Sequence, residues 1–136
     1  MKTKPTRLWA RRVFLAYAAC LFVATHWPNL VIEGPIPRPD LVAHCLAFGT
    51  WTALCMYAGW FARPASAENL FPSLLLSGMY AGVDEGLQAI PFVHRFAALD
   101  DFGANMIGVL LASAVAAWIA RRGSVRRAPG NSEGAP

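Results

Sequence analysis

Four long apolar stretches follow one another along the chain, and proline or charged residues separate them. The stretches cover residues 8–27, 41–61, 70–90 and 102–120. A helix needs about 20 mainly apolar residues to cross the hydrocarbon core of a bilayer, and each stretch reaches about that length. The pattern therefore predicts an all-α protein, an integral membrane bundle of four transmembrane helices whose main partner is the lipid bilayer.

The composition and the distribution of charge agree with this prediction. Hydrophobic residues make up 56% of the chain and charged residues only 15%, whereas soluble domains carry about a quarter charged residues. The formal net charge is +4, but most of the basic residues lie within the first 12 positions or after residue 120. Because no basic stripe remains in between to contact a phosphate backbone, we expect no nucleic-acid partner.

The basic ends also predict an orientation in the membrane. Basic residues favour the cytoplasmic side, and an even number of spans places both termini on the same side. We therefore expect a multi-pass protein of the bacterial inner (cytoplasmic) membrane with both termini in the cytoplasm. Residues 1–120 would form the membrane domain, and residues 121–136, rich in Arg, Gly and Pro, a disordered basic cytoplasmic tail.

Polar residues at membrane depth gather near the outer ends of the last three predicted helices. They are Asp40 and His44 on the second helix, Asp84, Glu85 and Gln88 on the third, and Asp101 and Asn105 on the fourth, with Arg95 in the outer loop. Each helix contributes a pair spaced by four residues, so the two members share a face. Ionisable groups inside a membrane usually face the bundle interior or a wet cavity. The arrangement predicts one polar pocket at the outer leaflet.

Some of these residues also have simpler interpretations, which the sequence leaves open. Asp40 stands where the second helix begins and could act as its N-cap, and Asp100 or Asp101 could cap the fourth helix in the same way. Gln88 and Asn105 could be interhelical hydrogen-bond partners. Glu85 is harder to explain in this way, and we expect it to lie within salt-bridge reach of Arg95.

Small residues predict where helices approach one another closely. Gly78, Gly82 and Gly86 form a stripe on the third predicted helix, and Gly108 lies on the fourth. In lipid, such stripes allow two helix backbones to pack tightly.

The polar segments resemble a known family. Asp40-x-x-x-His44 resembles the opening of the second helix in the VanZ-like family, and the segment from Tyr80 through Asp84-Glu85 to Gln88 is similar to that family's central signature. The final element of the resemblance is formed by Arg95, Asp101, Asn105 and Gly108. The chain departs from the family pattern at Val93-His94, where Pro-Gly is usual, and at Ala112, where Gly is expected.

The resemblance implies a small membrane protein of the bacterial cell envelope, and the family is named for a member linked to resistance to the glycopeptide teicoplanin. One hypothesis is a pocket that binds or processes an envelope component, such as a lipid-linked precursor, with a possible effect on glycopeptide susceptibility. A second is a non-enzymatic scaffold or accessory subunit whose polar cluster only locks the bundle, and a third is a small transporter. No motif fixes a catalytic reaction, and we expect no cofactor and no metal.

Overall fold

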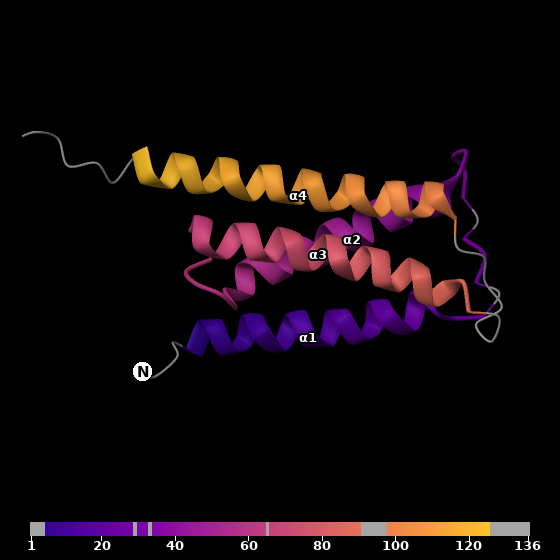
Figure 1. The fold of residues 1–136 in the computed structure, drawn as a ribbon, viewed down its shortest axis with the longest axis horizontal. Coiled ribbons are helices and arrows are strands. Elements are labelled where there is room, and N and C mark those ends of the chain that lie inside the picture. Colours follow the sequence, from indigo (N-terminus) through magenta and orange to yellow (C-terminus); the bar gives the residue numbers. More distant parts are fainter. Residues whose placement is uncertain (1–4, 29, 33, 65, 91–97, 126–136) are drawn as a thin grey trace, which may run out of the picture.

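The structure is a computed structural model that describes residues 5–28, 30–32, 34–64, 66–90 and 98–125. Within these residues the chain forms four helices and no strand, which confirms the all-α bundle. The helices are α1 (Pro5–Thr25), α2 (Pro39–Ala58), α3 (Ala67–Gln88) and α4 (Leu99–Val125). Successive helices run in opposite directions, and α1 and α4 lie on opposite sides of α2 and α3 (Figure 1).

The two ends of the bundle carry opposite charge. One end, here called the basic end, holds the start of α1, the α2–α3 connection and the end of α4 (Figure 1). Its described cations are Arg7, Arg11, Arg12, Arg63, Arg121 and Arg122. The opposite end, here called the acidic end, carries the following described charges: Asp40, Asp84, Glu85, Asp100, Asp101 and Arg38.

The helix boundaries lie within a few residues of the predicted ones. α2 begins at Pro39, because proline has the backbone angle of a first helical residue and lacks only an N–H that would be unpaired there. α4 continues past residue 120, the predicted end, through Arg121 and Arg122 to Val125. Arginine is a good helix former and is favoured at the negative end of the helix dipole. The predicted tail at 121–136 is therefore helical as far as Val125, and residues 126–136 lie outside the described part of the chain.

The third helix has its polar face inside and its apolar face outside. Its buried positions are Asn69, Ser73, Ser77, Ala81, Asp84, Glu85 and Gln88. Its exposed apolar side chains include Phe71, Leu75, Met79 and Val83. A surface helix of a soluble protein has the reverse arrangement, with the apolar stripe turned toward the core. The outward face of α3 therefore fits lipid rather than water.

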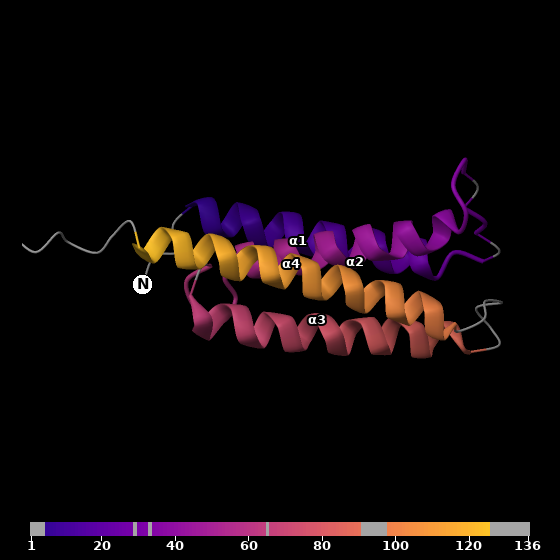
Figure 2. The ribbon, with the colours of Figure 1, turned by 90° about the horizontal axis from the view of Figure 1, so that it is seen from above.

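Three of the four helices, α1, α2 and α4, are long and apolar enough to cross a membrane. α3 is not among them, although a fourth span was predicted there, because the polar side chains of its buried face lower its mean hydropathy. Those side chains are hidden by the neighbouring helices, and α3 runs alongside the others over most of their length (Figure 2). The composition thus supports a membrane protein, and the place of α3 in the bilayer follows from its position in the bundle.

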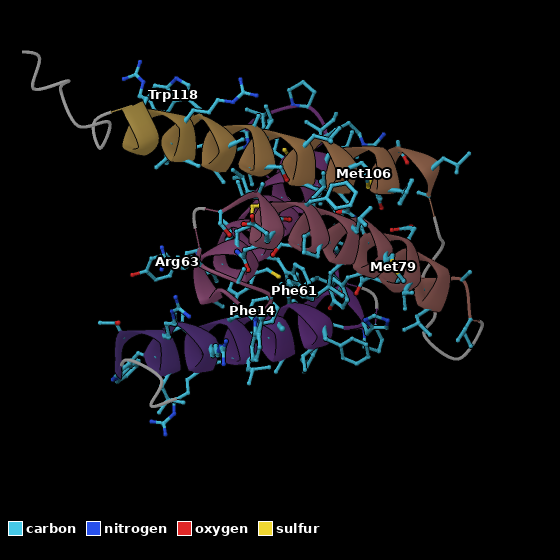
Figure 3. The ribbon with its side chains drawn as sticks, turned by 60° about the vertical axis from the view of Figure 1, so that its left-hand side comes forward. Phe14, Phe61, Arg63, Met79, Met106 and Trp118 are labelled. Atoms are coloured by element: carbon cyan, nitrogen blue, oxygen red, sulfur yellow. The ribbon has the colours of Figure 1, made fainter. Side chains whose placement is uncertain are left out.

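Aromatic side chains fill the centre of the bundle around α2. The rings of Trp51 and Tyr80 stack with their centroids 4.8 Å apart and their planes 4° from parallel. Phe14 meets the Trp51 ring edge-on at 4.9 Å, and it points from α1 toward the rest of the bundle (Figure 3). Such offset and edge-on pairs are favourable beyond their burial, so this cluster ties α1, α2 and α3 together.

The closest approach of two helix backbones lies between α2 and α4. A Cβ atom added at Gly108 would collide with the backbone oxygen of Cys45 and lie 2.9 Å from the backbone nitrogen of Gly49. A Cβ atom at Gly49 would lie 3.3 Å from the backbone oxygen of Gly108. Only glycine at position 108 permits this crossing.

The glycine stripe of α3 makes looser contacts. A Cβ atom at Gly78 would lie 3.7 Å from Met106 Cε, and one at Gly82 would lie 3.9 Å from Phe102 Cε2. Both are ordinary van der Waals distances, and at Gly86 no described atom lies within 4 Å. The structure therefore places the tightest helix contact at the Gly49–Gly108 crossing and not in the α3 stripe.

Two polar side chains fix the basic end. Arg11 Nη2 donates to the backbone oxygen of Gly59 at 2.9 Å, and its guanidinium lies 4.7 Å from the centre of the Trp60 ring. Asn69 Nδ2 donates to the backbone oxygen of Met56 at 2.8 Å. These bonds satisfy carbonyl groups at the end of α2 that have no partner within the helix, and they hold α1 and α3 against it.

We expect Gly108→Ala to lower the free energy of unfolding by about 1–3 kcal/mol, the usual effect of overpacking a tight contact. The added methyl group would force α2 and α4 apart at Cys45. Thermal unfolding of the purified protein in detergent, followed by circular dichroism, measures the change. Gly86→Ala adds the same methyl group where no described atom stands nearby, so it should keep the wild-type stability or raise it by up to about 1 kcal/mol, because alanine is the better helix former. Equal stability of the two variants would contradict the close crossing.

Candidate functional site

All four helices bring polar side chains together at the acidic end. We call this group the acidic-end cluster; it consists of Thr25, His26, His44, Asp84, Glu85, Gln88, Asp101 and Asn105. Asn105 is completely buried, Asp84 and Gln88 are 1% exposed, and His44 and Glu85 are 7% exposed. Polar groups this deeply buried are costly unless they find partners, so their contacts determine what the cluster can do.

Asp84 is the centre of the first half of the cluster. Its Oδ1 atom accepts a hydrogen bond from the Thr25 hydroxyl at 2.8 Å, and its Oδ2 atom accepts one from Gln88 Nε2 at 3.1 Å. His26 Nδ1 lies 3.8 Å from the same carboxylate. Gln88 lies one helical turn after Asp84, on the same face of α3. The Asp84 carboxylate thus joins the end of α1 to the end of α3.

His44 is the centre of the second half. Its Nδ1 atom lies 3.0 Å from Asn105 Oδ1, and its Nε2 atom lies 3.7 Å from Asp101 Oδ2. Asp101 and Asn105 are four residues apart, so both project from the same face of α4. The Gly49–Gly108 crossing brings this face against the start of α2. The imidazole therefore lies between an amide and a carboxylate, and of these three groups the imidazole and the carboxylate are the ones that can transfer protons.

Glu85 stands between the two halves. Its Oε1 atom accepts a hydrogen bond from the backbone N–H of Ala98 at 2.7 Å, immediately before α4 begins. A carboxylate in this position satisfies a free N–H group and is favoured by the helix dipole. Glu85 follows Asp84 on α3, and Thr25, which bonds Asp84, lines one cavity together with His44, so the two halves lie next to each other.

Arg38 holds a separate, exposed group of charges. Its Nη2 atom lies 3.0 Å from Asp40 Oδ2 and 2.7 Å from Asp100 Oδ2. The hydrogen bond to Asp40 has the largest effect and the one to Asp100 the next, and both raise the pKa of the Arg38 guanidinium. Arg38 has a left-handed backbone with φ 53°, which is uncommon for a residue other than glycine. The same Nη2 atom lies 3.9 Å from Asp101 Oδ1, so Arg38 connects the exposed group to the buried cluster.

The cluster contains most of the residues predicted for the pocket. His44, Asp84, Glu85, Gln88, Asp101 and Asn105 come together, whereas Asp40 belongs to the exposed group around Arg38. Asp40 is not the N-cap of α2, because Arg38 occupies that position without a side-chain cap bond. Arg95 lies outside the described residues, so its predicted contact with Glu85 stays a prediction.

Sequence reasoning missed the contributions of Thr25 and His26. They are adjacent polar residues at the end of the first apolar stretch, next to the Trp27-Pro28 boundary, and the prediction includes them only as part of the first helix. The signal that could have found them is the antiparallel order of the helices, because the end of α1 must lie beside the end of α3. The role of Arg38 was not predicted either, because its left-handed backbone cannot be read from the sequence.

Several buried polar atoms of the cluster have no hydrogen-bond partner among the described residues. They are His26 Nε2, Glu85 Oε2, Gln88 Oε1, Asp101 Oδ1 and Asn105 Nδ2, together with the nearby Tyr80 hydroxyl. A cavity of about 150 Å³ between α1 and α2 is lined by Thr25 and His44 and by apolar neighbours. This volume corresponds to roughly five water molecules, but the lining is mostly apolar, and none of the unpaired atoms belongs to a residue that lines the cavity.

The described residues contain no group of three or more His, Cys, Asp or Glu side chains placed to hold a metal ion. Comparison of the chain with protein-family models, curated proteins and solved structures found no match. The similarity to the VanZ-like family therefore depends on the motif residues alone.

The predicted contact between Glu85 and Arg95 can be tested by a double-mutant cycle. If the two side chains form an ion pair, Glu85→Gln and Arg95→Gln should be non-additive, with an interaction energy of about 0.5–3 kcal/mol in thermal unfolding. The control cycle combines Glu85→Gln with Arg63→Gln, a cation of the basic end, and should be additive within about 0.5 kcal/mol. Additivity in both cycles would refute the pair.

Proposed function

We propose that this chain is a VanZ-like integral membrane protein of the bacterial inner membrane, with its basic end in the cytoplasm and its acidic end at the outer leaflet. The support is the separation of charge along the bundle. Arginines occupy the start of α1, the α2–α3 connection and the end of α4, and positive residues favour the cytoplasmic side. Exposed tryptophans at the basic end, Trp9 and Trp118, suit the interface between lipid and water.

The function we propose is the binding or processing of an envelope component in the acidic-end cluster. A lipid-linked component is the chemistry that fits, since it would present a polar group at the outer leaflet and an apolar chain to the bilayer. The VanZ-like resemblance depends on residues from three separate segments of the sequence. His44, Asp84 and Asn105 stand in those segments and belong to one cluster, which supports a shared role for them.

One observation carries this proposal: the cluster holds buried polar atoms that the described residues do not satisfy. Gln88 Oε1 and Asn105 Nδ2 are amide atoms of residues that are at most 1% exposed. Leaving such an atom unpaired costs about 1–3 kcal/mol. A ligand with hydroxyl or amine groups would satisfy donors and acceptors together, and the His44 imidazole beside a carboxylate supplies groups for acid–base chemistry.

The alternative is a non-enzymatic scaffold or accessory subunit whose cluster only locks the helices. The observation in its favour is the set of bonds that join different helices. Thr25 of α1 bonds Asp84 of α3, and Glu85 of α3 bonds the backbone at the start of α4. These bonds would stabilise the bundle whether or not a ligand binds.

The orientation can be tested by labelling single cysteines in intact cells. In a background with Cys20, Cys45 and Cys55 replaced by alanine, Ile36→Cys in the α1–α2 connection should react with a membrane-impermeant maleimide added outside. Ser132→Cys, in the C-terminal tail, should react only after the cells are permeabilised. Labelling of the tail in intact cells would refute the proposed orientation.

Glu85→Gln separates the two proposed functions. If the cluster is a ligand site, this variant should lose at least about 90% of activity and keep the helix content of wild type, because functional sites often carry features that folding does not require. The readout is the change in teicoplanin susceptibility when the chain is produced in a susceptible bacterium. If the cluster is only a lock, activity and thermal stability should fall together.

Glu68→Gln is the matched control for this experiment. It makes the same change on the same helix, but at the exposed start of α3. It should therefore keep both wild-type stability and wild-type susceptibility. An active and stable Glu85→Gln variant would argue against both roles of the carboxylate.

A further inference from the structure

The second half of α4 stands apart from the rest of the bundle. Ala104, Asn105, Gly108 and Val109 are buried, but no residue from position 110 to 123 is. From the Gly49–Gly108 crossing toward the basic end, α4 runs along the edge of the bundle (Figure 1). An apolar hollow lies on each side of this half-helix, one next to α2 and one next to α3.

The hollow between α3 and α4 combines apolar walls with a cation. It has a volume of about 360 Å³; Leu70, Phe71 and Leu74 line it from α3, and Ala117 and Arg121 line it from α4. The volume corresponds to roughly a dozen groups the size of a water molecule or a methylene. A single hydrocarbon chain therefore matches the hollow in size and in chemistry.

The hollow next to α2 is larger but differs in charge. It has a volume of about 660 Å³, and Gly49, Ala53, Leu111, Ala112 and Ala116 are among its lining residues. None of its lining residues is charged. A lipid chain in this hollow would therefore not be selected by its headgroup, which makes this hollow a natural control.

We propose that the α3–α4 hollow is a binding site for an anionic phospholipid, with one acyl chain between Leu74 and Ala117 and the phosphate group on Arg121. Three features of the structure converge on this ligand. The walls are apolar, the cation stands at the end of the bundle where the other arginines lie, and arginine can donate two parallel hydrogen bonds to a phosphate. The site is at the opposite end from the acidic-end cluster, so it does not depend on the function proposed there.

The headgroup part of the proposal is tested with Arg121→Gln. The full chain, purified in detergent, is exposed to equal amounts of phosphatidylglycerol and phosphatidylcholine with identical acyl chains, and native mass spectrometry counts the lipid that stays bound. The wild type should retain phosphatidylglycerol preferentially. Arg121→Gln should lower that preference roughly fivefold, the effect of about one basic residue beside an anionic lipid.

Arg7→Gln is the matched control, because Arg7 lies at the basic end on α1, which does not pack against α4. It should keep the wild-type preference. Equal losses in Arg7→Gln and Arg121→Gln would mean that the preference belongs to the whole basic end, and would overturn the site. A wild-type protein without any preference for phosphatidylglycerol would overturn it as well.

The chain part of the proposal is tested by filling the hollow. Ala117→Phe should reduce the amount of bound phosphatidylglycerol severalfold, whereas Ala112→Phe, which fills the α2 side, should leave the preference between the two lipids unchanged. Circular dichroism checks that each variant is helical, and Ser113→Leu, on the same hollow, replaces Ala117→Phe if that variant does not fold. Wild-type retention in the folded variant would overturn the proposal.

Discussion

The arrangement of this bundle depends on the need to hide polar groups from lipid. α3 carries a polar stripe along its whole length, from Asn69 through Ser73 and Ser77 to Asp84 and Gln88. In a hydrocarbon solvent each unsatisfied polar group costs several kcal/mol, so this stripe must face other helices. Once α3 is turned inward, its carboxylates are forced to meet α1, α2 and α4, and the acidic-end cluster follows from that orientation.

The crossing of α2 and α4 sets the geometry of the cluster. Because Gly49 and Gly108 have no side chains, the backbones of α2 and α4 come into direct contact there. This contact lies about one helical turn from the pair formed by His44 and Asn105. This contact keeps the imidazole within hydrogen-bond distance of the Asn105 amide. The same crossing acts as the last firm contact of α4, since no residue beyond Val109 is buried as far as position 123. The crossing therefore explains both why the polar end of α4 is held firmly and why its apolar end lies open.

The sequence predicted the helices well because long apolar stretches with prolines between them are a strong signal. It also indicated several of the polar residues that come together, since four antiparallel helices bring the ends of α1 and α3 beside the starts of α2 and α4. It did not find Thr25 and His26, and it included Asp40, which pairs with Arg38 outside the cluster. Two kinds of information were missing. A stripe such as Gly78, Gly82 and Gly86 shows which residues share a face but not what that face contacts. The left-handed backbone of Arg38 and its contacts with Asp40 and Asp100 are not revealed by any local pattern of the sequence.

Contacts at the basic end and in the middle of the bundle help to keep the acidic-end cluster together. Buried carboxylates tend to repel one another, and relaxation of the helices would relieve that repulsion unless other contacts prevented it. Here Arg11 and Asn69 hold α1 and α3 against the end of α2 at the basic end, and the Trp51–Tyr80 stack holds the middle. The start of α4 is held by the Gly49–Gly108 crossing, by His44 on Asn105 and by Glu85 on the backbone of Ala98. These contacts offset the repulsion among Asp84, Glu85 and Asp101, and they keep the three carboxylates together at the acidic end.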